Sequence, residues 1–543
     1  MYIRNEDTIC APATIPGTGA ISVIRVSGPE ALTIADKVVS CNKGSISDSK
    51  GYTLKFGIIY DKPNNCNTND CNAEHASTNT LDKAVVDEVV VSIFRAPHSY
   101  TGENSVEISC HASSFIVSSI LHLLYEAGAR AAEPGEFTQR AYLNGKMDLA
   151  QAEAVADVIA SQNAAAHRVA FKQMKGGFSS ELRDMRSELL ELVSLMELEL
   201  DFSEEEVEFA DRSRLDDLLE EITSHVTRLI DSFRLGNAIK NGVPVAIAGA
   251  TNTGKSTLLN ALLGEDRAIV SDVHGTTRDT IEETLNIDGI LFRFIDTAGL
   301  RETSEVIEKI GIERTFKKIS EASVVLGMVD LTRDFETSSE TVREIVEKVD
   351  FTTQKLVILL NKTDICPVNK NVTLYNYIVS NIEDKGITIN EIENSSKEVI
   401  SVPQTEIIAE NIGKSSKDSQ DHTLSTAESY GLKRSRNGQT YIIPISAKTG
   451  SGINDLRSVL ASTQRDLLAD SDTTLVTNQR HVQALADART SLLRVRDGLA
   501  SGLPTDLAAQ DIREAIYHLG SIVGEISTDE VLGNIFANFC IGK

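Results

Sequence analysis

The sequence predicts a multidomain protein of mixed α/β and α class. Its 543 residues correspond to three or four domains of ordinary size. Short β-rich runs divided by glycine and proline turns fill residues 1–145, which indicates a mixed α/β region. Helical periodicity from Lys146 and again from about Ser471 encloses residues 242–465, where strands and helices alternate as in a parallel sheet with crossover helices.

The composition is that of an acidic globular protein. The chain is 41% hydrophobic and 24% charged, which excludes wholesale disorder, and 53 basic against 79 acidic residues give a net charge of −26. Phosphate neutralisation drives binding to nucleic acid through a broad basic face, so such a face is excluded. A local pocket or a basic partner could still bring nucleic acid to the chain.

Bulk features favour a cytoplasmic protein with no membrane association. No apolar run approaches the ~20 residues that span a bilayer, and the N-terminus resembles neither a signal peptide nor a transit peptide. Seven scattered cysteines fit a reducing compartment. Cys66 and Cys71, with His75 nearby, fit a solvent loop better than a metal site, which needs four ligands at defined spacings.

In the N-terminal region the expected strands are Ile21–Val26, Tyr52–Tyr60, Val85–Phe94 and Ser105–Cys110. The polar run 61–80 between two of them is expected to be an insertion loop.

The next region is expected to be helical. The Ala-rich run that follows Lys146 has 3.6-residue periodicity, and further helices are expected over about Ser180–Leu200 and Arg212–Gly236. The stretch Glu181–Glu221 holds 16 acidic and 4 basic residues, a net of −12. It is either a solvated helical face or a docking surface for a basic partner.

A phosphate-binding loop follows the apolar run Val243–Ala248. Residues 249–256 read GATNTGKS, which is GxxxxGK[ST] in the required strand–loop–helix context. Glycines let backbone N–H groups face phosphates, and the helix N-terminus adds positive potential. Lys255 is expected to reach the β- and γ-phosphates, and the Ser256 hydroxyl to ligate Mg²⁺.

Three more loops follow predicted strands and complete a guanine-nucleotide site. Asp296, in the run DTAG (296–299), is placed to hold Mg²⁺ through water, and Gly299 N–H to meet the γ-phosphate. Asp364, in the run NKTD (361–364), can accept protons from guanine N1 and N2, a donor pair that adenine lacks. The run SAK (446–448) can offer a backbone N–H to guanine O6.

The segment between the phosphate loop and Asp296 reads as a switch. In GTTRD (275–279) a threonine can complete the Mg²⁺ shell when the γ-phosphate is present.

Activation of the attacking water is left open by the motifs. Ras-type enzymes use a glutamine where this chain has Leu300. Glu302, Glu305 and Glu308 are alternatives on spacing alone. Asn252 either ligates a monovalent cation, which would act much as an arginine finger does, or only braces the loop.

Between two of these loops the alternation of strand and helix stops. Residues 366–440 are rich in Ser, Asn, Lys and Glu, and we expect a mobile polar insertion with helix over part of it.

Seven segments together resemble the MnmE (TrmE) family of tRNA-modification GTPases over nearly the whole chain apart from the insertions. They are GTGAISVIRVSG (17–28), PHSYTGENSVEI (97–108), PGEFTQRAYLNGKMDLAQAEAVADVI (134–159), NTGKSTLLNAL (252–262), IVSDVHGTTRDT (269–280), DTAGLRET (296–303) and FCIGK (539–543).

The resemblance implies three domains. An α+β folate-binding and dimerisation domain would span 1–145, with its insertion at 61–80. A helical domain would comprise 146–241 and 466–543. A P-loop, Ras-like GTPase domain inserted in it would span 242–465, with its polar insertion at 366–440.

The resemblance also implies a potassium-stimulated GTPase that acts as a homodimer with the flavoprotein MnmG. The pair would add an aminomethyl or carboxymethylaminomethyl group at C5 of the wobble uridine of certain tRNAs. A tetrahydrofolate derivative, 5-formyl- or methylene-tetrahydrofolate, would supply the one-carbon unit, and FAD would belong to MnmG.

Site residues follow from the matching motifs. K⁺ would be held by Asn252, Ser271, Val273 and Thr276, Mg²⁺ by Ser256 and Thr277, and folate by Arg25, Glu107, Lys146 and Lys543. Catalysis would involve Glu308, Lys255, Arg278 and Cys540. The residues expected at GTP are Asn252, Thr253, Gly254, Lys255, Ser256, Thr257, Ser271, Asp272, Val273, His274, Gly275, Thr276, Thr277, Asp296, Thr297, Ala298, Gly299, Asn361, Lys362, Thr363, Asp364, Ser446, Ala447 and Lys448.

The sequence departs from the family's usual loop, GxPNxGKS, since it has Thr251 for proline and threonine for the second serine. Neither change removes a ligand. A ribosome-assembly GTPase of the Era/EngA type is the main alternative, although its usual basic RNA-binding domain is not visible. A folate sensor that uses GTP only as a switch is a third.

Overall fold

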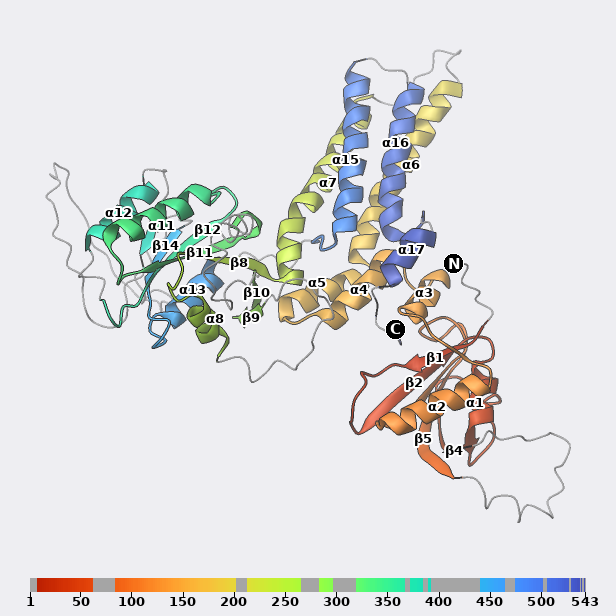
Figure 1. Ribbon diagram of the computed structural model, residues 1–543. Coiled ribbons are helices and arrows are strands. Elements are labelled where there is room, and N and C mark those ends of the chain that lie inside the picture. The colour runs from red at the N-terminus through yellow and green to blue at the C-terminus, as the bar shows by residue number, and fades with distance from the viewer. Residues whose placement is uncertain are drawn as a thin grey trace, which may run out of the picture. The chain divides into compact units, whose positions relative to one another are not determined.

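The computed structural model (Figure 1) describes residues 7–61, 84–201, 212–264, 283–295, 319–366, 372–383, 389–391, 440–463, 474–501, 505–526, 529–537, 539 and 542. The chain forms two compact units. One comprises residues 1–161, 167–233 and 476–543, and the other comprises 162–166 and 234–475. No helix in these described ranges is both long enough and apolar enough to cross a bilayer.

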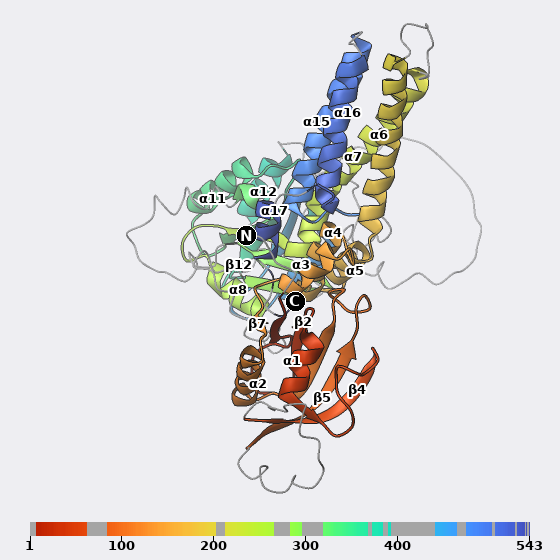
Figure 2. The same ribbon diagram turned by 90° about the vertical axis from the view of Figure 1, so that its right-hand side faces the viewer.

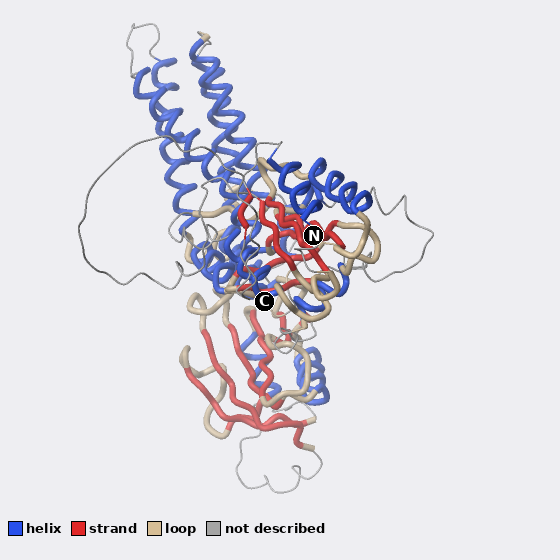
Figure 3. The backbone as a smooth tube through the Cα atoms, turned by 90° about the vertical axis from the view of Figure 1, so that its left-hand side faces the viewer, coloured by secondary structure: helices blue, strands red, loops and turns tan. Residues whose placement is uncertain are grey.

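A seven-stranded mixed sheet forms the N-terminal part of the first unit (Figure 3). Its order is β3-β4-β5-β6-β2-β1-β7, and the four predicted strands are confirmed as β2, β4, β5 and β6. The strands are β1 (Ile9–Pro12), β2 (Ile21–Ser27), β3 (Val39–Cys41), β4 (Thr53–Tyr60), β5 (Val85–Phe94), β6 (Ser105–His111) and β7 (Arg130–Ala131).

Helices α1 (Ala31–Val38) and α2 (Ser114–Glu126) cover one face of this sheet. Strand β5 shows the consequence, because Val89, Val91 and Ile93 are buried under the helices while Val90 between them is exposed. Val90 lies opposite Phe56 of β4, which is also exposed, so part of the second face is apolar.

Eight helices make up the rest of this unit within its described part. They are α3 (Glu136–Leu143), α4 (Leu149–Ala160), α5 (Ala164–Met174), α6 (Gly177–Asp201), α7 (Arg212–Asn241), α15 (Gln479–Ala500), α16 (Thr505–Val523) and α17 (Asp529–Phe536), of which α5 and α7 each extend into the second unit. The predicted helices over 180–200 and 212–236 are confirmed as α6 and α7. Helices α6, α7, α15 and α16 run side by side in both views (Figures 1 and 2). Their shared core includes Leu189, Leu219, Leu492 and Leu519.

The Ala-rich run after Lys146 forms two helices rather than one. Helix α4 begins with a capping box, in which Asp148 accepts from Gln151 N and the Gln151 side chain accepts from Asp148 N. It ends before Ser161, whose extended backbone separates it from α5. The predicted helical content is therefore confirmed, with a break that periodicity alone does not reveal.

The second unit is built on another seven-stranded sheet, of order β13-β14-β12-β11-β8-β10-β9. All described pairings are parallel except that of β9 with β10. The strands are β8 (Val243–Ala248), β9 (Glu283–Ile287), β10 (Ile290–Phe294), β11 (Val324–Asp330), β12 (Lys355–Asn361), β13 (Ile389–Glu391) and β14 (Thr440–Pro444). The alternating strands and helices predicted here are confirmed.

Helices cover both faces of this sheet. Helices α8 (Lys255–Leu263) and α13 (Ile453–Thr463) pack on one face, and α11 (Phe335–Lys348) and α12 (Val372–Glu383) on the other. Neighbouring residues of a strand face opposite layers, so Val357 joins the first core and Ile358 the second. This is a doubly wound α/β sheet.

Helix α12 and strand β13 revise the expectation for residues 366–440. The expected partial helix is present, but it is part of the core, because Leu374, Ile378 and Ile382 recur every four residues and are buried. Strand β13 was not expected. It pairs with β14 at the edge of the sheet, so residues 372–383 and 389–391 belong to the folded domain rather than to a mobile insertion.

Candidate functional site

The predicted nucleotide loops meet at the carboxyl-terminal ends of the parallel strands of the second sheet. They follow the parallel strands β8, β12 and β14, which together with β11 are neighbours in the order β14-β12-β11-β8. After β8 the chain continues to β9 and β10, which lie on one side of β8. After β11, which lies on the other side of β8, it continues to β12, so the two connections diverge. Ligands of open α/β sheets bind outside the carboxyl ends of the strands at such a point.

Two glycines of the phosphate loop are required by close contacts. A Cβ on Gly249, whose φ is +150°, would lie 2.6 Å from the Met328 carbonyl oxygen. A Cβ on Gly254, whose φ is +101°, would lie 2.5 Å from Asn361 Nδ2. The loop can therefore approach strands β11 and β12 only because both positions lack a side chain.

Lys255 folds back over the loop. Its Nζ donates to the carbonyl oxygens of Gly249 at 2.8 Å and Ala250 at 2.9 Å. Burial, and to a smaller extent the charge of Arg333, lowers the pKa of this ammonium group. A phosphate would supply the negative charge that these neutral carbonyls lack, so the geometry suits an anion at the loop.

Asn361 braces the phosphate loop against the loop after β14. Its side chain is buried, its Nδ2 donates to the Thr253 carbonyl at 2.7 Å, and its Oδ1 accepts from Ala447 N at 3.0 Å. One amide thus joins three loops, since Thr253 lies in the phosphate loop and Ala447 follows β14. This arrangement uses both the donor and the acceptor of the amide.

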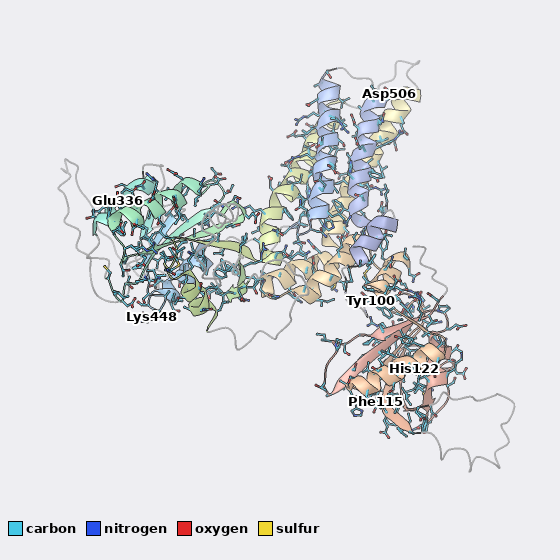
Figure 4. The ribbon with its side chains drawn as sticks, in the orientation of Figure 1. Tyr100, Phe115, His122, Glu336, Lys448 and Asp506 are labelled. Carbon is cyan, nitrogen blue, oxygen red and sulfur yellow. The ribbon has the colours of Figure 1, made fainter. Side chains whose placement is uncertain are left out.

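Asp364 and Ser446 lie together on the base-reading side. Asp364 is exposed, and its Oδ1 accepts from Ser446 Oγ at 2.7 Å. Thr363 N donates to the Ile445 carbonyl at 3.2 Å, which holds the two loops in register. Lys448 is exposed on the same loop as Ser446 (Figure 4). Within the described residues the Asp364 carboxylate accepts from one hydroxyl, which leaves the acceptor capacity that guanine N1–H and N2–H need.

The loop after β11 belongs to this site and was missed from the sequence. Asp330 Oδ2 lies 2.5 Å from Lys362 Nζ, and its Oδ1 accepts from the Thr332 backbone N–H and hydroxyl. Burial alone would raise the pKa of Asp330, but the hydrogen bonds from Lys362 and Thr332 lower it. Arg333 of the same loop donates to the Thr251 carbonyl. The sequence feature that could have predicted this part of the site is an aspartate at the end of an otherwise apolar strand.

The remaining predicted residues of the nucleotide site divide into two groups. Asn252 and Thr257 are exposed, and Ser256 is half-buried at the start of α8. The others lie outside the described residues. These are Ser271, Asp272, Val273, His274, Gly275, Thr276, Thr277, Arg278, Asp296, Thr297, Ala298, Gly299, Leu300, Glu302, Glu305 and Glu308.

Arg25 and Glu107, two of the predicted folate residues, pair directly in the N-terminal sheet. They are cross-strand partners on β2 and β6, and Arg25 Nη2 lies 2.7 Å from Glu107 Oε1. The Arg25 guanidinium also lies over the rings of Tyr100, at 5.1 Å, and Phe137, at 5.7 Å. This places a half-buried cation, a carboxylate and two aromatic rings together.

Lys146 lies against the same loop as Tyr100 (Figure 4 labels Tyr100). It is exposed, its Nζ donates to the Pro97 carbonyl at 2.9 Å, and a Cβ on Gly102 would lie 3.4 Å from its side chain. Near the C-terminus, Gly542 is packed so closely on β1 that a Cβ would lie 2.0 Å from the Pro12 carbonyl oxygen. Cys540 and Lys543 lie outside the described residues.

A buried ionic cluster supports this loop and was also missed. The Arg140 side chain is fully buried and pairs with Asp7 at 2.6 Å, Glu136 at 2.9 Å and Glu103 at 3.2 Å. Glu103 Oε2 in turn accepts from Ser27 Oγ at 2.8 Å. Burial alone would raise the pKa of Glu136, but its bonds to Arg130 and Arg140 lower it. The i,i+4 spacing of Glu136 and Arg140 is the feature of the sequence that could have predicted their ion pair.

Together, the doubly wound sheet, the glycine-dependent phosphate loop and the Asn361 brace define a P-loop GTPase. The MnmE helical domain model matches residues 149–540, and the GTP-binding protein TrmE N-terminus model matches residues 8–146. The chain therefore belongs to the MnmE family of tRNA modification GTPases.

Full-length relatives agree with this assignment. The tRNA modification GTPase MnmE of Bacteroides thetaiotaomicron is 47% identical, over 99% of this chain and 100% of its own. That of Flavobacterium psychrophilum is 45% identical over 99% of each chain. A crystal structure of Era from Aquifex aeolicus is 22% identical over 46% of this chain and 66% of its own, with a TM-score of 0.23.

Proposed function

We propose that this chain hydrolyses GTP to GDP and phosphate at the edge of the second sheet, with Mg²⁺ held by Ser256 and Thr277. The Asn361 brace carries the proposal, because it joins the phosphate loop and the base-reading loops through one buried amide. Lys255 would bind the β- and γ-phosphates in place of its two carbonyl partners. Asp296 and Gly299 complete the site by motif.

Potassium stimulation is the second part of the proposal. Asn252 adopts a φ of +61°, a left-handed conformation that asparagine tolerates better than most residues, and its exposed side chain lies at the tip of the phosphate loop. With Ser271, Val273 and Thr276 it would ligate K⁺, while Glu308 activates the water and Arg278 supports the switch. The cation would stabilise charge that develops on the phosphates.

Base recognition is tested by Asp364→Asn. Xanthine carries an oxygen where guanine carries its N2 amino group, so an amide at this position can accept from N1–H and donate to that oxygen. We expect the variant to lose GTP affinity and to gain affinity for XTP. Unchanged GTP affinity would show that Asp364 does not read the base.

Cation dependence is tested by multiple-turnover hydrolysis in KCl and in NaCl. We expect turnover to be faster in KCl, and Glu308→Ala to lower turnover while GTP affinity stays close to that of the wild type. Equal rates in both salts would contradict the potassium site.

We further propose that the chain acts with MnmG on the wobble uridine (position 34) of tRNA, using 5-formyl- or methylene-tetrahydrofolate. Arg25 and Lys146 flank the loop that carries Tyr100, where cations suit the carboxylates of a folate tail and an aromatic ring suits the pterin. Glu107 would accept from pterin N–H groups, and Lys543 and Cys540 would act near the same ligand. FAD would be bound by MnmG.

A cytoplasmic homodimer of three domains completes the proposal, with the domain bounds given above. The exposed apolar side chains Leu54, Phe56 and Val90 on β4 and β5 support dimerisation through the N-terminal sheet, because such a patch is unusual on a monomer. The net charge of −12 on 181–221 suits a basic partner.

A further inference from the structure

The loop after β11 supplies a cation that none of the nucleotide motifs contains. Arg333 immediately precedes Asp334, which caps α11 by accepting from Thr337 N at 2.9 Å. Its guanidinium donates through Nη2 to the Thr251 carbonyl of the phosphate loop, and its Nε lies 3.8 Å from Asp330 Oδ2. The side chain is 28% exposed.

Two carbonyl groups of the phosphate loop are held by side chains from other loops. That of Thr251 accepts from Arg333, and that of Thr253 accepts from Asn361. In a planar trans peptide the C=O and the following N–H point in opposite directions. A side chain that holds the carbonyl away from the ligand therefore turns the next N–H toward it, as phosphate binding requires.

The orientation of the Thr251–Asn252 peptide depends on a hydrogen bond to its carbonyl group. Both residues are exposed, Thr251 does not fix its own φ as proline would, and Asn252 has a left-handed φ of +61°. Within the described residues, Arg333 donates the hydrogen bond that the Thr251 carbonyl accepts.

We propose that Arg333 is a positioning residue for GTP binding, which sets the Thr251–Asn252 peptide so that the Asn252 N–H faces the phosphates. Asp330 anchors Arg333 and also pairs with Lys362, so one carboxylate links the phosphate loop to the base-reading loop. This inference deepens the proposed function and rests on the nucleotide site described above.

The test compares Arg333→Ala, Arg333→Lys and wild type in full-length protein, with mant-GDP and mant-GTP as probes. Arg343→Ala is the matched control, since Arg343 is an exposed arginine on α11. We expect Arg333→Ala to raise the Kd and the KM for GTP about tenfold, with kcat within twofold of wild type. Arg333→Lys, which can still donate one hydrogen bond, should recover most of the affinity, and Arg343→Ala should change neither constant.

Ionic strength separates a positioning bond from a diffuse charge effect. Screening is strong for exposed charges at 0.5 M salt and much weaker at 0.05 M. We expect the ratio of the variant and wild-type Kd values to persist at 0.5 M KCl. A ratio that falls to one would overturn the positioning role, as would an unchanged Kd at low salt or a change confined to kcat.

Folding and the proposed function are checked independently. Arg333 is at the surface, so the thermal transition of nucleotide-free Arg333→Ala should match that of wild type, and a lower transition would assign Arg333 a structural role instead. Failure of the wild type to hydrolyse GTP would refute the proposed function, whereas the Kd ratio needs no hydrolysis.

Discussion

The two units of the molecule stabilise their interior polar groups in different ways. Around the nucleotide loops the central brace is the neutral amide of Asn361. In the other unit two buried polar clusters are ionic. Glu153 of α4 pairs with Arg480 at 3.0 Å and with His481 at 2.6 Å, and Arg140 pairs with three carboxylates.

The difference reflects where charge is needed. A nucleotide brings several negative charges to the second unit, so the loops there present N–H groups and cations. Their central brace, Asn361, adds no charge, and the Asp330 carboxylate is balanced by Lys362 and Arg333. The clusters of Glu153 and Arg140 have to be balanced within the protein, because an unpaired buried charge is costly. A ligand site is therefore marked by polar groups that can still donate or accept hydrogen bonds, rather than by the strongest ion pairs.

The largest effect on stability is expected at Glu153. Glu153→Ala leaves Arg480 and the buried His481 without their carboxylate, which should cost about 3–5 kcal/mol of the helical domain's free energy of unfolding. Hydrogen exchange in peptides from α4 and α15 measures the loss. The exposed Glu188→Ala in the same bundle should leave exchange unchanged, and an equal effect of both substitutions would contradict the comparison.

Acid should remove the same contribution. Burial would raise the pKa of Glu153, but hydrogen bonds and charges from His481 and Arg480 lower it to about 2. Because the folded-state pKa of Glu153 lies below the unfolded-state value of ~4.3, its carboxylate stabilises the folded state at pH values above ~4.3. This stabilisation is lost as the pH falls toward 2. The gap in thermal stability between wild type and Glu153→Gln should therefore narrow between pH 5 and pH 2, and a constant gap would count against the ionic pairing.

Removal of the neutral Asn361 side chain should lower the free energy of unfolding somewhat less than removal of Glu153. Asn361→Ala leaves the Thr253 carbonyl and the Ala447 N–H without their partner, at about 2–4 kcal/mol in the nucleotide domain. GTP affinity should fall with it, since the phosphate loop loses its tie to the base-reading loops. Calorimetric titration with GDP measures the affinity, with exposed Asn376→Ala on α12 as the control. Full affinity in Asn361→Ala would refute the brace.

The smallest effect on stability, with a large one on binding, is expected at Arg25. The Arg25–Glu107 pair is half-buried, but glutamine can still donate one hydrogen bond to Glu107, so Arg25→Gln should cost about 1–2 kcal/mol. Binding of 5-formyl-tetrahydrofolate should weaken at least tenfold, as followed by fluorescence titration. Lys37→Gln on α1 serves as the control. Undiminished binding would remove Arg25 from the folate site.

Local sequence patterns predicted most of the fold and part of the site. Strand β8 and the start of α8 follow from an apolar run that ends at a glycine-rich loop, and Asn361 and Asp364 follow from a motif after a strand. The partners that were missed depend on contacts between segments distant in the sequence, as in Arg333 with Thr251 and Glu153 with His481. Strand β13 was missed because three residues on a sheet edge carry no periodic signal.

Mass spectrometry of tRNA from a deletion strain tests most directly whether the GTP site serves tRNA modification. We predict that the deletion removes the C5 modification from wobble uridine 34, that the wild-type chain restores it, and that Lys255→Ala does not. Unchanged modification in the deletion strain, or full restoration by Lys255→Ala, would contradict the account.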